Sequence, residues 1–355
     1  MKYLFLLATL TLHASNTYTI TNLGTLGGAL SIGTGVNSSG QVSGLSRTAD
    51  GENRAFFWNG TAMVDIGTLG GDDSRGRGIN DSGQITSNAL TATFDNHAFF
   101  WNGASMVDLG TAGGLQSVGN AINNAGQITG FTDRPDNTSR AFFWNGASML
   151  NLGTLGGDYS SGRAVNASGQ IAGSASMTGN ASDHAFFWNG TSMVDLGTLG
   201  GTWSSASGIN DAGQVTGEAR LAGDVEQRAF LWNGSTMQDL GTLGGTFSQG
   251  ADINNAGQIV GGAYNTGNVA QRAFIWTGGV MSDLNNLLVN GAGWDLTMAR
   301  AINDAGQITG DGYFNGQQRA FLLTPTTTAS ETPEPATALL IGASLLALFI
   351  ARSRH

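Results

Sequence analysis

One short motif recurs along the chain and limits what the chain can fold into. The 355-residue sequence contains DLGTLGG or a close variant beginning at Asn22, Asp65, Asp108, Asn151, Asp195 and Asp239, and a degraded copy, DLNNLLV, beginning at Asp283. A glycine-rich loop that binds a nucleotide phosphate occurs in one place, and a helix with a Lys or an acidic partner follows it. Neither follows here, so seven copies indicate scaffold rather than a phosphate site.

Two further elements recur once per repeat. A turn of the form Asn-x-Ala/Ser-Gly, followed by Gln, begins at Asn37, Asn80, Asn123, Asn166, Asn210, Asn254 and Asn303. An aromatic strand, AFFW or a variant, contains Phe56, Phe99, Phe142, Phe186, Phe230, Phe274 and Phe321. The period of 43 to 44 residues, with four short strands in each repeat, is typical of a β-propeller blade such as the WD-type repeat.

The intervals between these elements show which parts of the repeat are constrained. Gly24 precedes Asn37 by 13 residues, and the same interval recurs in the next five repeats. The interval from the Gln to the aromatic Phe varies between 14 and 16 residues. Constant intervals indicate strands in fixed hydrogen-bonded register, and a variable interval indicates a surface loop.

The two ends of the array complement each other. The first repeat lacks an aromatic hairpin partner for YTITNLG, and the last lacks a partner for RAFLLTP. Pairing residues 18–23 with residues 320–324 would close a ring and remove its open sheet edges. We therefore predict an all-β fold, a seven-bladed β-propeller over residues 17–325 with four strands per blade. A β-solenoid is the alternative, and it would need capping ends.

Composition excludes several classes of protein. Charged residues make up 11% of the chain, the formal net charge is −10, and Lys2 is the single lysine. Nucleic acid is therefore not an expected partner, because binding phosphates requires clustered Lys or Arg. The absence of cysteine excludes disulfides and thiolate chemistry.

Both ends of the chain look like targeting segments. Residues 1–14 have a basic start, an apolar stretch and a small residue at Ala14, which predicts a signal peptide; a buried first strand is the alternative. Residues 326–332 form a Thr/Ser-rich linker. Residues 336–351 are uncharged and would extend about 24 Å as a helix, long enough to just span a membrane. The arginines that follow this apolar segment predict that the C-terminal end of the chain stays in the cytoplasm.

The C-terminal segment, residues 333–355, resembles the PEP-CTERM sorting signal of Gram-negative bacteria. The resemblance rests on Pro333, Glu334 and Pro335, the apolar helix, and the basic tip with Arg352 and Arg354. It implies an exosortase-type sorting enzyme as a partner, transient anchoring in the inner membrane, cleavage of the tail, and delivery to the cell surface or its exopolysaccharide. A permanent membrane anchor is the alternative.

The repeats themselves resemble the HAF-repeat family of bacterial extracellular proteins. HAFFW occurs at His97 and His184, and DLGTLGG with IN-x-x-GQ completes the family pattern over about residues 18–324. Arginine replaces the histidine at Arg54, Arg140, Arg228, Arg272 and Arg319. A ring of histidines is thus not available, and the resemblance implies no particular reaction.

Recurring polar and aromatic side chains have structural explanations. Arg54 and Asp65, His97 and Asp108, and Arg228 and Asp239 fall on one face of a hairpin, as cross-strand ion pairs would. The tryptophans of the aromatic strands repeat in register, which favours core or inter-blade packing: Trp58, Trp101, Trp144, Trp188, Trp232 and Trp276. We predict no catalytic residue, no metal site and no cofactor.

One position differs between repeats and predicts a binding face. A serine stands in each of six repeats, and the residue before it changes from Leu30, Asp73 and Gln116 to Tyr159, Trp203 and Phe247, with Trp294 nearby in the seventh repeat. Neighbouring aromatic faces suit stacking against sugar rings, and packing on adjacent strands is the alternative explanation.

These features together predict an exported, non-enzymatic surface protein. It would serve as a structural or binding module, with a surface polysaccharide or another surface protein as its partner. Carboxylates are plentiful, so a propeller-fold glycan-processing enzyme is the alternative function.

Overall fold

The computed structural model describes residues 17–326, of which Tyr18–Pro325 form one compact unit. The predicted signal peptide, the sorting segment with its apolar helix, and the linker beyond Thr326 lie outside the described residues. Between residues 17 and 326 there is no helix of the length and hydropathy needed to cross a membrane.

The described chain consists almost entirely of short strands. The first strands are β1 (Thr17–Asn22), β2 (Gly27–Val36), β3 (Val42–Thr48), β4 (Asn53–Trp58), β5 (Met63–Asp65), β6 (Gly70–Ile79), β7 (Ile85–Thr91), β8 (Asn96–Trp101), β9 (Met106–Asp108), β10 (Gln116–Ile122), β11 (Ile128–Asp133), β12 (Ser139–Trp144) and β13 (Met149–Asn151). Next come β14 (Gly156–Val165), β15 (Ile171–Met177), β16 (Asp183–Trp188), β17 (Met193–Asp195), β18 (Gly200–Ile209), β19 (Val215–Leu221), β20 (Gln227–Trp232) and β21 (Met237–Asp239). The last strands are β22 (Gly244–Ile253), β23 (Ile259–Asn265), β24 (Gln271–Thr277), β25 (Val280–Asp283), β26 (Trp294–Ile302), β27 (Ile308–Phe314) and β28 (Gln317–Thr326). Three short 3-10 turns are η1 (Thr178–Asn180), η2 (Thr266–Asn268) and η3 (Leu284–Leu287).

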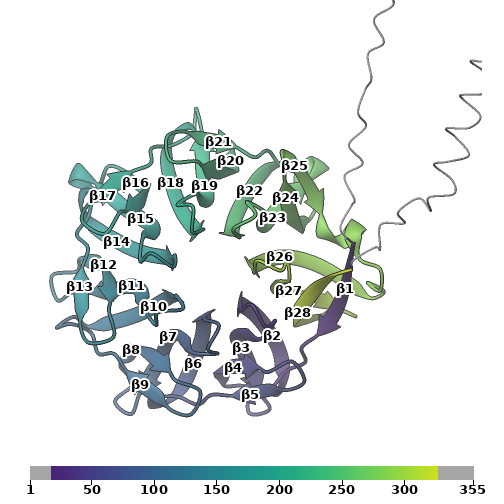
Figure 1. The fold of residues 1–355 in the computed structure, drawn as a ribbon, viewed down its shortest axis with the longest axis horizontal. Helices are drawn as coiled ribbons and strands as arrows, with labels where there is room; N and C mark the ends of the chain where they lie inside the picture. The colour runs from purple at the N-terminus through teal and green to yellow at the C-terminus, as the bar shows by residue number, and fades with distance from the viewer. Residues whose placement is uncertain (1–16, 327–355) are drawn as a thin grey trace, which may run out of the picture. The chain divides into compact units, whose positions relative to one another are not determined.

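Antiparallel groups of four strands are the unit of the fold. Three groups are separate sheets, and the other four form two eight-stranded sheets, each joined by one parallel pair, Ser139 with Tyr159 or Gln227 with Phe247. The groups are arranged radially, and strands β2, β6, β10, β14, β18, β22 and β26 lie innermost (Figure 1). The predicted all-β, propeller-like architecture is therefore confirmed.

The N-terminal and C-terminal strands belong to the same sheet. Strand β1 lies beside β28 in the order β1-β28-β27-β26, and the backbone N–H of Leu23 donates to the carbonyl of Ala320 at 3.1 Å. The predicted pairing of the first and last strands is confirmed.

The Asn-Gly hairpin turns differ in detail from the expected turn. Gly60 has a φ of 102°, whereas Asn59 is not among the residues with positive φ. The Asn59 side chain instead accepts hydrogen bonds from the backbone N–H groups of Thr61 and Ala62, both at 3.0 Å. Asparagine is used here as a side-chain acceptor, and the glycine alone supplies the left-handed conformation.

Aromatic side chains form the core within and between the groups. The recurring phenylalanines are among the largest fully buried side chains, for example Phe99 and Phe186. Several tryptophans contact the preceding group, as where the rings of Phe57 and Trp101 lie with centroids 5.5 Å apart. The predicted core and inter-blade packing is confirmed.

The constant serine of each repeat joins neighbouring groups. Fully buried Ser204 on β18 donates to the carbonyl of Gly197 at 2.6 Å and accepts from the backbone N–H of Ala185 on β16 at 2.8 Å. Ser74, Ser117, Ser160 and Ser248 make the same pair of bonds. A hydroxyl both donates and accepts, which explains why serine recurs at this position.

Candidate functional site

A polar cavity lies where the innermost strands meet. Its volume is about 600 Å³, and its lining comes from the inner strands β2, β6, β10, β14, β18, β22 and β26, with Leu45 and Glu218 from the second strands β3 and β19. Strands from every four-stranded group therefore contribute to this one cavity.

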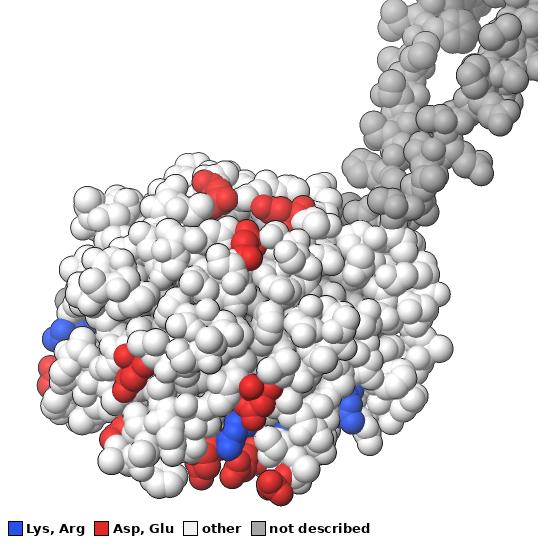
Figure 2. All heavy atoms as spheres, turned by 60° about the horizontal axis from the view of Figure 1, so that its bottom comes forward, with Lys and Arg blue, Asp and Glu red and all other residues white. Residues whose placement is uncertain are grey.

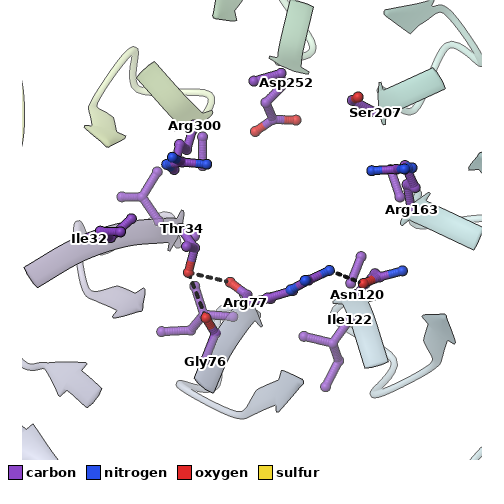
Figure 3. Close-up of a pocket in the computed structure, with 18 of the residues that line it drawn as sticks. Ile32, Thr34, Gly76, Arg77, Asn120, Ile122, Arg163, Ser207, Asp252 and Arg300 are labelled. Atoms are coloured by element: carbon purple, nitrogen blue, oxygen red, sulfur yellow. Dashed lines mark hydrogen bonds between the residues drawn. The ribbon is translucent and has the colours of Figure 1, made fainter. Parts of the chain in front are cut away.

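One register position supplies a cavity-lining residue from each repeat. It is the third residue before the constant asparagine, and its occupants are Thr34, Arg77, Asn120, Arg163, Ser207, Ala251 and Arg300. In Figure 3, the labelled side chains of Arg163, Ser207, Asp252 and Arg300 point into the same space. The positions beside this one carry glycine or alanine, apart from Asp252, whereas the occupant of this position varies between repeats.

Four arginines, Arg75, Arg77, Arg163 and Arg300, line the cavity of a chain whose net charge is −10. The face in Figure 2 is mostly uncharged, with carboxylates more frequent than basic groups, so the cavity differs in charge from the surface shown. Arg77 donates to the Asn120 side chain, and burial together with the charges of Arg163, Arg75 and Arg300 lowers its pKa.

Two carboxylates also line the cavity. Asp252 accepts hydrogen bonds from the backbone N–H groups of Ile302 at 3.0 Å and Ile253 at 2.9 Å. Burial raises the pKa of Asp252 to about 7 despite these bonds, and the negative charge of Asp304 adds to the effect. Burial also raises the pKa of Glu218, although the nearby Arg163 opposes the shift.

A ring of aliphatic side chains separates this cavity from a smaller hollow. The ring consists of Val36, Ile79, Ile122, Val165, Ile209, Ile253 and Ile302. The hollow beyond has a volume of about 230 Å³ and is lined by the constant asparagines and the residues that follow them. The larger cavity therefore narrows to an apolar constriction at this end.

The constant asparagines form a circuit of hydrogen bonds. The Nδ2 group of Asn37 donates to the carbonyl of Asn80 at 3.1 Å, and each later asparagine donates likewise to the next repeat. Asn303 donates to the carbonyl of Asn37 at 2.8 Å, so the circuit returns to its start. All seven side chains are buried. This circuit fixes the inner strands to one another directly beneath the cavity.

The predicted ligand-binding aromatics lie in four different groups. Tyr159, Trp203, Phe247 and Trp294 belong to β14, β18, β22 and β26, and none of them lines the cavity. No aromatic pair joins them to one another within residues 17–326.

Three of these aromatics pack against the next strand of their own sheet. The guanidinium of Arg220 lies 5.8 Å from the ring centroid of Trp203. Phe247 packs edge-on against Tyr264 at 5.7 Å. Trp294 lies 5.1 Å from Phe314. All four aromatics remain partly exposed.

The predicted cross-strand pairs are present on the hairpins. His97 Nδ1 lies 2.8 Å from an Asp108 oxygen, and the Arg54 Nε lies 3.7 Å from Asp65. Arg228 Nε and Asp239 are farther apart, at 4.0 Å. These contacts confirm the structural role expected for the His/Arg position. Within the part of the chain that the structure describes, no three His, Asp or Glu residues gather in a group that could hold a metal ion.

Sequence reasoning missed the cavity residues, although a signal for them was present. The third residue before each constant asparagine varies in the same way as the residue before each constant serine. Only the latter was interpreted as a binding position. What was missing was the direction of the side chains, because the repeat alone does not show which strand faces the centre of the ring.

No protein-family model matches the sequence, and no curated protein matches it. Among solved structures, a puromycin-hydrolysing peptidase from Mycobacterium tuberculosis has a TM-score of 0.53 at 12% identity, with 88% of this chain and 55% of that chain covered. The acylaminoacyl peptidase of Pyrococcus horikoshii has a TM-score of 0.50 at 9% identity, with 83% and 53% covered. The six-bladed β-propeller lectin of the fungus Aleuria aurantia has a TM-score of 0.38 at 11% identity, with 76% and 95% covered.

These comparisons concern architecture alone. The chain spans about half the length of the two peptidases it resembles. The identities are low, so the likeness extends to the fold and not to activity or ligand. The radial arrangement of four-stranded groups is itself that of a β-propeller fold.

Proposed function

We propose that this protein is an exported, non-enzymatic binding module of the cell surface, built as a closed seven-bladed β-propeller. The seven groups of four strands support this blade number. The asparagine circuit, which passes through seven repeats and returns to Asn37, supports closure.

One observation carries the binding function: constant scaffold positions surround a cavity whose lining varies. The buried asparagines, serines and phenylalanines are nearly the same in all repeats. The position facing the cavity carries threonine, arginine, asparagine, serine or alanine. A purely structural ring has no need of arginines at this position, because the constant asparagines, serines and phenylalanines already join the strands. A preformed cavity with a few charged and polar groups is typical of a ligand site.

The proposed ligand class is carbohydrate, and specifically a polysaccharide of the producing cell's own surface. Partly exposed Trp203 beside Arg220 offers an apolar face with a charged neighbour, which suits a sugar ring. Tyr159, Phe247 and Trp294 occupy comparable places in neighbouring blades and extend this candidate face. The cavity and the aromatic positions are two separate surfaces on which the polysaccharide could be held.

A pull-down with purified surface polysaccharide tests the function. We expect wild-type protein to be retained, and we expect Trp203→Ala and Tyr159→Ala each to reduce retention about five-fold if the aromatic face contributes. The control is Val194→Ala, which removes an exposed side chain from the outer strand β17. Failure of the wild-type protein to bind any surface polysaccharide would contradict the proposed function.

The same incubation distinguishes a binding module from the alternative, a glycan-processing enzyme. The proposal predicts that the polysaccharide is recovered at its original length. New reducing ends that appear in proportion to protein and time would contradict the non-enzymatic assignment.

The proposed destination depends on segments outside the described residues. We propose that residues 1–14 direct export, and that Pro333, Glu334 and Pro335 with Arg352 and Arg354 are recognised by an exosortase-type enzyme after transient anchoring in the inner membrane. Cell fractionation tests this proposal: deleting residues 333–355 should prevent surface delivery. Unchanged surface delivery after the deletion would contradict it.

A further inference from the structure

The positive charge of the cavity is not balanced by its own carboxylates. Arg300 is neutralised, because its Nε lies 2.6 Å from buried Asp311. Arg75 has a longer contact, 3.5 Å, with Asp73. Arg77 and Arg163 form no salt bridge with any carboxylate in residues 17–326. Two guanidinium groups on different blades therefore face the cavity without a salt-bridge partner, although Glu218 is close enough to Arg163 for their charges to interact.

The carboxylates that line the cavity are already engaged. Glu218 accepts a hydrogen bond from the Gln227 side chain. Asp252 is held by two backbone N–H groups, and at neutral pH it is only partly ionised because its pKa is raised to about 7. Neither group can fully offset the arginines, so the cavity keeps a net positive charge.

Arg77 shows what kind of ligand would be favourable. Its guanidinium has five N–H donors, and its one described side-chain partner is Asn120 (Figure 3). Burial and three neighbouring arginines disfavour its charged form and lower its pKa. An anion in the cavity would supply hydrogen-bond acceptors to Arg77 and would also relieve the repulsion between the arginines. A neutral sugar would supply acceptors only.

We propose that the central cavity binds a small ligand, or the end of a polymer, that carries two or more anionic groups, with Arg77 and Arg163 as its principal ligating residues. The proposal rests on the binding function proposed above and assigns that function's site to the cavity. Carboxylate and phosphate share the required chemistry. The volume of about 600 Å³ suits a ligand of up to a few sugar rings. Arg77 is on β6 and Arg163 on β14, so a ligand with two or more anionic groups would contact two groups of strands.

Titration calorimetry of the full chain in detergent tests the proposal with four defined probes. These are trigalacturonate, citrate, pyrophosphate and the neutral maltotriose. We expect at least one polyanion to bind and maltotriose not to bind, with affinity falling as salt rises. Comparing the two polycarboxylates with pyrophosphate identifies the preferred anion.

Three variants locate the site. Arg77→Gln and Arg163→Gln should each weaken polyanion binding about ten-fold or more. Arg47→Gln makes the same charge change at an exposed side chain of β3, outside the cavity, and should leave the affinity unchanged. Thermal melting of each variant verifies that the fold is retained.

Two results would overturn the proposal: no binding of any polyanion, or equal weakening by Arg47→Gln, which would indicate diffuse surface charge. Polysaccharide retention that is the same in wild type and Arg77→Gln would leave the binding function standing while removing the cavity from it.

Discussion

At the scale of single residues, the buried asparagine of each repeat hydrogen-bonds both to its own turn and to the next repeat. The Nδ2 group of Asn166 donates to Gln170 Oε1 at 2.8 Å and to the Asn210 carbonyl at 3.1 Å. Its Oδ1 accepts from the N–H groups of Ser168 and Gln170. One side chain thus closes its own turn and joins two blades.

We expect Asn166→Ala to lower the free energy of unfolding by about 2–4 kcal/mol, because several buried groups lose their partners. The control is Asn189→Ala, at an exposed hairpin turn of the same blade, which should cost less than about 1 kcal/mol. Urea denaturation measures both. Equal losses would show that the circuit adds nothing beyond turn formation.

Asp252 makes stability depend on pH. Its pKa is about 7 in the folded protein and 3.8 in an ordinary carboxyl, so the folded state holds the proton to higher pH than the unfolded chain does. Its contribution to stability is therefore largest at acidic pH, falls as pH rises from about 4 to about 7, and is level above that. Asp304 intensifies this shift, and Arg300 lines the same cavity.

The difference in stability between wild type and Asp252→Asn isolates this effect from the other carboxyl groups. We expect the variant to gain relative to wild type as pH rises from 4 to 7, since it lacks the titrating group. Denaturation at several pH values measures this difference. A difference that is constant over this range would contradict the assignment.

At the scale of elements, the serine on each inner strand holds neighbouring blades together. We expect Ser204→Ala to cost about 1–3 kcal/mol, because the carbonyl of Gly197 and the N–H of Ala185 both lose a partner in a fully buried place. Adjacent Ser205, also buried, has no described side-chain hydrogen bond, so Ser205→Ala should cost less than about 1 kcal/mol. Thermal melting compares the two, and a larger loss for Ser205→Ala would contradict the proposed role.

The strands were predictable because the sequence repeats them. The constant 13-residue interval from Gly24 to Asn37 reflects an inner strand and its turn, and the aromatic hairpin appears as β4 and β5. The pairing of the first and last strands was predictable because residues 18–23 and residues 320–324 each lack a partner strand within their own repeat.

The site was less predictable for a physical reason. Trp203 and Arg163 both occupy positions that vary between repeats, on inner strands of neighbouring blades. Whether such a side chain lies against an adjacent strand, as Trp203 does beside Arg220, or enters the central cavity, as Arg163 does, depends on how the four-stranded groups are arranged around the cavity. That arrangement involves all the groups together and is not encoded in a single repeat.

At the scale of the whole molecule, the repeats together form one cavity at the centre of the fold. One variable position contributes a cavity-lining residue from each repeat, and residues such as Asp252 and Glu218 add to the lining, while the buried positions stay nearly the same. The claim that follows is that the cavity contacts the ligand.

Arginine footprinting with phenylglyoxal, in the presence and absence of the surface polysaccharide, tests this claim most directly. In the free protein, phenylglyoxal should label Arg77 and Arg163, because both side chains are exposed and line the cavity. With ligand bound, labelling of Arg77 and Arg163 should fall several-fold, while labelling of exposed Arg47, outside the cavity, stays unchanged. Labelling of Arg77 and Arg163 that the ligand does not change, or equal protection of Arg47, would contradict it.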